Sequence, residues 1–175
     1  MPLSTIASNQ IKNDTIVDAN INSSANIATT KLGTGAILQT VVSSSEANQV
    51  MTSSSYADIP SGGHQITITP NFTSSQILLI FTGSRASYTT TNGISSLKIV
   101  RSIGGGSFSD VKVIEDGHYL TDYGYSRSST ILDSPSTTSA VIYKMQGKST
   151  GTGNAHYTYS GVPAVLTAME IRVWA

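Results

Sequence analysis

Acidic side chains are the first candidates for chemistry in this sequence, because glycoside hydrolysis needs two carboxylates held about 5 to 10 Å apart. The carboxylates that come into question are those of Asp110, Glu115, Asp116, Asp122 and Asp133. Glu115 and Asp116 are adjacent, so on a strand they point to opposite faces. Asp116-Gly117 is more typical of a turn between two strands. The spacing therefore predicts no catalytic pair.

Serine is abundant, but the motifs that would make it a nucleophile or a phosphate ligand are incomplete. Gly105-Gly106-Ser107-Phe108-Ser109 fails the nucleophile-elbow pattern at its last position. Gly147-Lys148-Ser149-Thr150 resembles the end of a phosphate-binding loop, but Ile142 stands where that loop requires glycine. We therefore predict no catalytic residue, no enzyme activity and no cofactor.

Histidine is the remaining metal-ligand candidate, because the chain has no cysteine. None of His64, His118 and His156 lies in a recognisable metal-binding pattern. A histidine near a three-fold axis would be presented three times, and His118 and His156 are the ones to consider for this. The expected state of each is a surface or interface histidine without a ligand, so we predict no metal.

Tyrosine-rich segments offer the more promising binding surface. Tyrosine presents a flat apolar face to a sugar ring and a hydroxyl to its polar edge. The candidates for binding a receptor are His118, Tyr119, Tyr123, Tyr125 and Arg127 in one segment, and His156, Tyr157 and Tyr159 in a second. A glycan platform is one interpretation. The other is that the tyrosines pack inside the domain or between subunits.

Many short strands must position these segments. The sequence predicts strands at residues 37–42, 49–52, 56–59, 64–69, 77–81, 95–101, 110–114, 139–146, 155–159 and 165–174. Ile66 and Ile68 alternate with threonines and should face a core. The continuous apolar run from Ile77 to Phe81 predicts a strand covered on both faces.

The final strand places Val165, Thr167, Met169, Ile171 and Val173 on one face, with Glu170 and Arg172 on the other. No amphipathic helix is indicated after residue 37, and turn-forming clusters recur at nearly regular intervals. This pattern predicts an all-β, antiparallel, jelly-roll-like β-sandwich over residues 37–175.

Residues 1–36 follow a different pattern. The apolar residues recur at steps of five, with one step of six, and they are Ile6, Ile11, Ile16, Ile21, Ile27, Leu32 and Ile37. This spacing forms no stripe on an α-helix and alternates faces on a strand. Three chains wound around one axis would bury what one chain exposes. We predict an extended, trimeric N-terminal arm, the alternative being a disordered polar tail.

Composition restricts the partners. Ten basic and ten acidic residues give a formal net charge of zero, so no positive field gathers phosphates, and we expect no nucleic acid. No run of about 18 apolar residues is present, and the first residues lack the pattern of a signal peptide, so we expect neither membrane insertion nor secretion by that route. Because the chain has no cysteine and therefore no disulfides, its stability must come from packing or assembly.

Several motifs resemble a known family. They are Tyr56-Ala57-Asp58-Ile59, Ile66-Thr67-Ile68-Thr69-Pro70, Ser74-Ser75-Gln76-Ile77-Leu78-Leu79, the stretch from Leu132 to Lys144 and Leu166-Thr167-Ala168-Met169-Glu170-Ile171. In order and spacing they are similar to the C-terminal domain of tail-fibre-like proteins of aquatic phages, especially cyanophages. The Asn- and Ala-rich repeats of residues 1–36 resemble those that precede such domains. The ending Arg172-Val173-Trp174-Ala175 and the short arm depart from that pattern.

The resemblance implies a homotrimeric protein of the phage virion, in the tail, fibre or baseplate region. Two functions follow as hypotheses. In the first, the outer domain recognises a host surface polysaccharide, and the arm contacts other tail or baseplate proteins. In the second, the protein is an architectural accessory fibre of a baseplate, neck or capsid without receptor binding. About 30 extended residues reach at most about 100 Å, and this short arm adds weight to the second hypothesis.

Overall fold

The structure of the chain is a computed structural model. It describes residues 33–47, 49–59, 64–88, 93–120, 125–150, 155–158 and 163–173, without the side chains of the strand residues 84–88, 93–94, 115–120, 125–126 and 155–158. The predicted arm, including Ile6, Ile11, Ile16, Ile21, Ile27 and Leu32, lies outside the described residues.

The chain divides into residues 1–32 and 33–175. This division lies slightly ahead of the predicted boundary at residue 36, because the residues just before the first strand bond to the end of the last one. Gly35 N donates to the carbonyl of Arg172 at 2.8 Å, and Arg172 N donates to Ala36 O at 3.0 Å.

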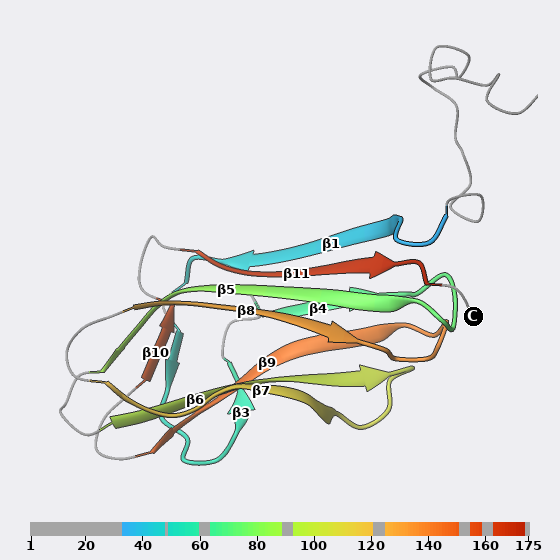
Figure 1. Cartoon of the computed structure of the whole chain (residues 1–175). Helices are drawn as coiled ribbons and strands as arrows, with labels where there is room; N and C mark the ends of the chain where they lie inside the picture. The colour runs from blue at the N-terminus through green and yellow to red at the C-terminus, as the bar shows by residue number, and fades with distance from the viewer. Residues whose placement is uncertain are drawn as a thin grey trace, which may run out of the picture. The chain divides into compact units, whose positions relative to one another are not determined.

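The described part of the second unit consists of antiparallel strands and contains no helix (Figure 1). The strands of the first sheet are β1 (Ile37–Ser45), β2 (Gln49–Met51), β5 (Gln76–Tyr88), β8 (Tyr125–Asp133), β10 (Ala155–Thr158) and β11 (Ala164–Ile171). Their order is β1-β11-β5-β10-β2, and β8 pairs with the other edge of β5.

The second sheet lies below the first in Figure 1. Its strands are β3 (Ala57–Asp58), β4 (Gln65–Ile68), β6 (Gly93–Ile103), β7 (Ser109–Leu120) and β9 (Val141–Thr150). The order is β3-β9-β6-β7, and β4 also pairs with β9. The predicted all-β class with antiparallel sheets is confirmed, and the two stacked sheets form a sandwich-like domain.

The core lies between the two sheets and is built from alternate residues of each strand. Ile77, Leu79 and Phe81 of β5 are at most 2% exposed. They meet inward side chains of the second sheet, among them Ile68 and Tyr143. The predicted inward orientation of Ile66 and Ile68 is confirmed.

The apolar run of β5 is covered on one face only within this chain. Ile77, Leu79 and Phe81 are buried, whereas Leu78 and Ile80 are only partly buried. The prediction of a strand covered on both faces is therefore wrong for the single chain. Leu78 and Ile80 point to the outer side of the first sheet, where no second layer of the described chain lies.

The last strand buries the side that carries its charge. Leu166, Ala168 and Glu170 of β11 are fully buried, while Val165 and Met169 are partly exposed on the outer side. A buried carboxylate is tolerated only where hydrogen bonds replace its water shell. The polar turn before β5 provides these bonds, and for this reason the more apolar side of the alternating pattern does not face the core.

The turn residues Asn71 and Ser75, together with Gln39 of β1, surround the Glu170 carboxylate. It accepts hydrogen bonds from Asn71 N at 2.6 Å and Asn71 Nδ2 at 2.7 Å. Ser75 Oγ and Gln39 Nε2 each donate to it at 2.6 Å. Burial alone would raise the pKa of Glu170, but these hydrogen bonds outweigh it and lower the pKa below its ordinary value.

Two local predictions differ from the structure. Asp116 and Gly117 lie inside β7 and form no turn, because β7 goes on pairing with β6 as far as Leu120, with a shift of register at these two residues. The strand β8 was not predicted, since its half from Tyr125 to Thr130 is rich in serine and has no apolar alternation. By contrast, Gly104 and Gly105 form the β6–β7 turn at φ of 58° and 79°, where glycine is favoured.

Candidate functional site

The domain has two ends, and the N-terminal unit joins it at one of them. Gly35 and Ala36 bond to Arg172, so the chain enters beside the end of β11. Gln76, the first residue of β5, pairs with Ile171 at this same end. We call it the entry end. From here β1, β5 and β11 run the length of the first sheet (Figure 1).

The first tyrosine-rich segment lies at the opposite end. His118 and Tyr119 close β7, where they pair with Ser95 and Ile94 at the beginning of β6. Tyr125 opens β8 and pairs with Ala86, near the end of β5. Ala86 is about ten residues along β5 from Gln76, which corresponds to roughly 34 Å at about 3.4 Å per residue.

The second tyrosine-rich segment reaches the same end through β10. His156 pairs with Val50 of β2 and with Ser87 of β5. Since Ala86 and Ser87 are consecutive, the strands that carry Tyr125 and His156 lie on either side of the end of β5. They are separated by two interstrand steps, about 10 Å. The fold thus brings together two segments that are far apart in the sequence. We call this region the distal end.

The predicted binding side chains belong to this end but are mostly outside the described part. For His118, Tyr119, Tyr125, His156 and Tyr157 the structure describes the backbone only. Tyr123 and Tyr159 lie outside the described residues. The prediction that these side chains bind a receptor therefore stays a prediction.

Arg127 is the one predicted binding residue with a described side chain, and it is buried. It is 8% exposed, and its Nη2 donates a hydrogen bond to Ser95 Oγ at 2.5 Å. Since Arg127 belongs to β8 and Ser95 to β6, this contact joins the two sheets. In the single chain the guanidinium therefore has a structural contact and lies away from the surface.

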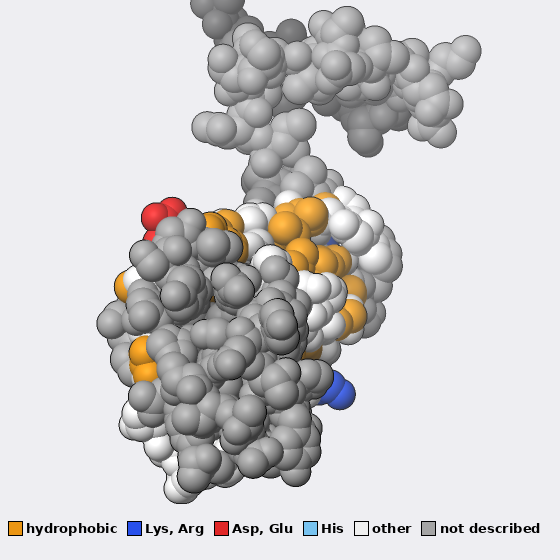
Figure 2. Space-filling model, turned by 90° about the vertical axis from the view of Figure 1, so that its left-hand side faces the viewer, with side chains coloured by type: hydrophobic (Ala, Val, Ile, Leu, Met, Phe, Trp, Pro, Cys, Tyr) orange, Lys and Arg blue, Asp and Glu red, His pale blue; other side chains and the backbone are white. Residues whose placement is uncertain are grey.

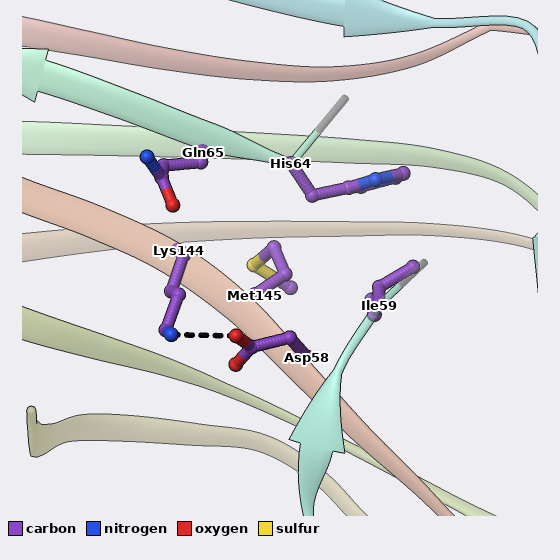
Figure 3. A pocket seen from close by; sticks show the side chains of 6 residues that line it. All are labelled: Asp58, Ile59, His64, Gln65, Lys144 and Met145. Carbon is purple, nitrogen blue, oxygen red and sulfur yellow. Dashed lines mark hydrogen bonds and ion pairs between the residues drawn. The ribbon is translucent and has the colours of Figure 1, made fainter. Parts of the chain in front are cut away.

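A small pocket lies beside β9, where β3 and β4 pair with consecutive parts of that strand. It has a volume of about 170 Å³ and is lined by Asp58, Ile59, His64, Gln65, Lys144 and Met145 (Figure 3). Lys144 Nζ and Asp58 Oδ2 are 2.7 Å apart, and Gln146 Nε2 donates to Asp58 Oδ1 at 2.9 Å. Burial acts to raise the pKa of Asp58, but the hydrogen bonds from Lys144 and Gln146 outweigh it and lower that pKa.

His64 gives this pocket little catalytic capacity. In Figure 3 its ring points away from the Asp58–Lys144 pair, and the ring centroid lies 6.4 Å from that of Phe81. Neither ring nitrogen has a hydrogen-bond partner among the described residues. Burial lowers the pKa of His64 to about 4, so the imidazole is neutral at pH 7. A general base must lie within hydrogen-bond reach of the proton that it abstracts, and the His64 ring is buried and turned away from the polar groups of the pocket.

The described carboxylates from the predicted set are held by cations. Asp133 accepts hydrogen bonds from Arg101 Nη1 at 2.5 and 2.6 Å, and Asp110 lies 2.6 Å from Lys98 Nζ. In the described ranges no three His, Asp or Glu side chains converge as metal ligands would.

Sequence reasoning missed the pocket, although one signal for it existed. Ile59 and His64 flank Pro60-Ser61-Gly62-Gly63, a strong turn signal that brings the two flanking segments close together. The pairing of β9 with both segments could not be inferred from the sequence.

Comparison of the sequence with known families and curated proteins identifies no relative. No protein-family model matches the chain, and a search of curated proteins finds no similar sequence. Among the described residues no helix has the length and hydropathy needed to cross a membrane.

Proposed function

We propose that this chain is a homotrimeric fibre protein of a bacteriophage particle, in which the distal end of the sandwich recognises a host surface polysaccharide. One observation carries the proposal: the two tyrosine-rich segments meet at the end of the domain opposite to the entry end. A fibre attached to the virion through its N-terminal unit would then present its tyrosines outward.

A jelly-roll arrangement is part of this proposal. The orders β1-β11-β5-β8 and β4-β9-β6-β7 support it, because consecutive strands among these eight lie in opposite sheets, with β6 and β7 as the one exception. Double-sheet jelly rolls of eight strands occur in viral and carbohydrate-binding proteins. This analogy supports the setting, while the role rests on the distal end.

The trimer is supported by residues 6–32. Their apolar side chains recur every five or six residues and find no common face on a helix or a flat strand. Three chains around one axis would bury them and place three distal ends side by side. Weak contacts of one domain with a repeating glycan then add up through multivalency.

The composition fits an uncharged polysaccharide better than a charged partner. Charged residues are 11% of the chain, against about 25% in ordinary globular proteins, and the formal net charge is zero. Tyrosine stacking and hydroxyl hydrogen bonds do not depend on charge. We further propose that the protein is not an enzyme, and release of oligosaccharide from host envelope material would contradict this.

Adsorption tests the proposal directly. Phage carrying Tyr123→Ala and Tyr125→Ala together should assemble but lose adsorption to the host. The matched control is Phe108→Ala, which removes an exposed aromatic ring at the β6–β7 turn, away from the distal end. Normal adsorption of the double tyrosine variant would overturn the receptor role of this cluster and favour an architectural accessory fibre.

A further inference from the structure

The outer face of the first sheet is uncharged, and about half of its side chains are apolar, the others being mainly serine and threonine. It is formed by the outward side chains of β1, β11, β5 and the part of β8 from residue 128 onward, and we call it the uncharged face. Gln39, Glu170 and Asp133 of these strands point inward, because each bonds to groups between the sheets or in the turn before β5. None of the outward side chains described there is ionisable.

Cross-strand register gathers the apolar side chains of this face into one group. Met169 pairs with Leu78, and Leu78 pairs with Leu132 on its other side. The neighbouring row contains Val42, Thr167 and Ile80. Leu132 is 53% exposed and Val42 59% exposed. Figure 2 shows the largest group of hydrophobic side chains at the upper right of the described surface and smaller groups on its left half.

The outer side of the second sheet is different. It carries the ion pairs Lys98–Asp110 and Lys144–Asp58. Lys98 Nζ and Lys148 Nζ also lie 4.5 and 4.7 Å from the centre of the Tyr56 ring. One sheet therefore has a charged outer face, and the other has an uncharged outer face with a group of neighbouring apolar side chains. An exposed apolar group of this kind marks an interaction site.

The continuous apolar run of β5 also favours a second layer of protein over the uncharged face. Its run Ile77-Leu78-Leu79-Ile80-Phe81 is the pattern of a strand buried on both faces. Within one chain only Ile77, Leu79 and Phe81 are buried. Leu78 and Ile80 would complete the pattern if another layer covered the uncharged face.

We propose that a second copy of this chain covers the uncharged face, so that the sandwich domains pack on one another through β1, β11, β5 and β8. This inference rests on the proposed function, in which residues 1–36 bring three copies together. Identical faces that carry no charge do not repel each other, whereas a charged partner would find no complementary group here. Moreover, the chain enters the domain next to β1, the edge strand of this same sheet.

The area of the uncharged face fits a contact between copies that the N-terminal unit already holds together. Four strands about 4.8 Å apart and about seven residues long cover roughly 450 Å². A stable interface buries about 800 Å² on each partner. The uncharged face alone is therefore too small for a stable dimer, but it suffices between copies that are already tethered.

Thiol chemistry on the full-length chain tests this proposal cleanly, because the natural sequence has no cysteine. Single variants Val42→Cys and Leu132→Cys place a thiol on the uncharged face, and Val113→Cys places one on β7, where Val113 is 41% exposed. We expect maleimide to react at least tenfold more slowly at positions 42 and 132 than at 113. Light scattering on the same samples should give three times the chain mass.

Crosslinking identifies the occupant. In the double variant Val42→Cys, Leu132→Cys the two thiols of one chain are three interstrand steps apart, about 14 Å. A bismaleimide with a shorter spacer can therefore join them only between chains. We expect dimers and trimers on a denaturing gel from this variant and monomers from Val113→Cys.

The outcomes separate this inference from the proposed function. A trimer with fast labelling at positions 42 and 132 would overturn the inference and leave the trimeric assembly in place. A trimer with slow labelling but no crosslink between chains would also overturn it, because the N-terminal unit would then cover the face. A monomer in solution would overturn the assembly itself, and the inference with it.

Discussion

The hydroxyl of Tyr143 donates a hydrogen bond of 2.7 Å to Asp133 Oδ2 and so joins the two sheets. Tyr143 is fully buried, and Asp133 also binds Arg101. Burial raises the pKa of Tyr143, and the charge and hydrogen bond of Asp133 raise it further, so the phenol stays protonated. The arrangement gives a partly buried carboxylate both a positive partner and a neutral donor.

Tyr143→Phe should therefore lower the free energy of unfolding by about 1.5–3 kcal/mol, the range for a hydrogen bond to a charged group. The measurement is urea unfolding at fixed protein concentration. Tyr56→Phe is the matched control, because its ring keeps its contacts with Lys98 and Lys148 and the change should cost less than about 0.5 kcal/mol. Equal losses in both variants would show that the bond to Asp133 contributes nothing.

His64 should make stability depend on pH between about 4 and 6.5. Its pKa is lowered from 6.5 to about 4 by burial, so the unfolded chain takes up a proton in this range and the folded chain does not. Stability is then fully present above pH 6.5 and falls by about 3 kcal/mol as the pH drops to about 4. His64→Phe should remove this slope, because phenylalanine fills the same site beside Phe81 without titrating.

Thermal unfolding in buffers across this pH range measures the effect. Tyr56→Phe is the control, because it changes no histidine, and it should keep the slope of the natural chain. An unchanged slope in His64→Phe would mean that His64 titrates alike in the folded and unfolded states.

Glu170 should make the stability of the fold depend on pH in a second, more acidic range, which we call the acid limb. Its pKa lies below the ordinary value of 4.5, so its contribution to stability is complete above pH 4.5 and is lost as the pH falls through the lower folded-state value. Glu170→Gln should flatten this acid limb. It should also cost at least about 1.5–3 kcal/mol at pH 7, since the amide cannot accept as many hydrogen bonds from Asn71, Ser75 and Gln39.

Acid unfolding followed by circular dichroism compares the two chains. The slope between pH 4.5 and 6.5, assigned to His64, should be the same in both and serves as the internal control. If stability falls equally steeply with acid in Glu170→Gln, other carboxylates and not Glu170 cause this loss.

Much of the fold follows from local alternation and turn chemistry. The strands around Ile66 and Ile77 were predictable, because period-two apolar patterns and the turn at Pro70-Asn71 define them. Strand β8 was not, since its residues from Tyr125 to Thr130 are mostly polar and become a strand through pairing with β5. Such tertiary pairing overrides local preference.

The orientation of β11 shows the second limit. Val165, Met169 and Ile171 indicate one apolar face, but Leu166 and Ala168 on the other side are also apolar. The choice between the two sides depends on the donors from the turn before β5, which hold Glu170 from about a hundred residues away in the sequence. The two tyrosine-rich segments are visible in the sequence. That they meet at the distal end depends on the pairing of β5 with β8 and β10, which the sequence does not show.

Gly83 shows how closely the core of the distal half is packed. A Cβ at this position would lie 2.7 Å from Cζ of Phe81 and 3.0 Å from its Cε1. The Phe81 ring is 2% exposed and packed in the core, so a shift of the ring would disturb its core neighbours. Gly83→Ala should therefore overpack the core and lower the free energy of unfolding by about 1–3 kcal/mol.

The matched control is Gly33→Ala, where a Cβ would meet nothing within 4 Å. It should leave stability unchanged or raise it slightly, because alanine restricts the unfolded chain. Because Gly83 pairs with Arg127 and Ser129 pairs with Phe81, displacement of the ring by Gly83→Ala should also speed amide hydrogen exchange along this part of β8. Exchange that is faster at the entry end and unchanged here would contradict the proposed overpacking, since the strain would then lie far from Phe81.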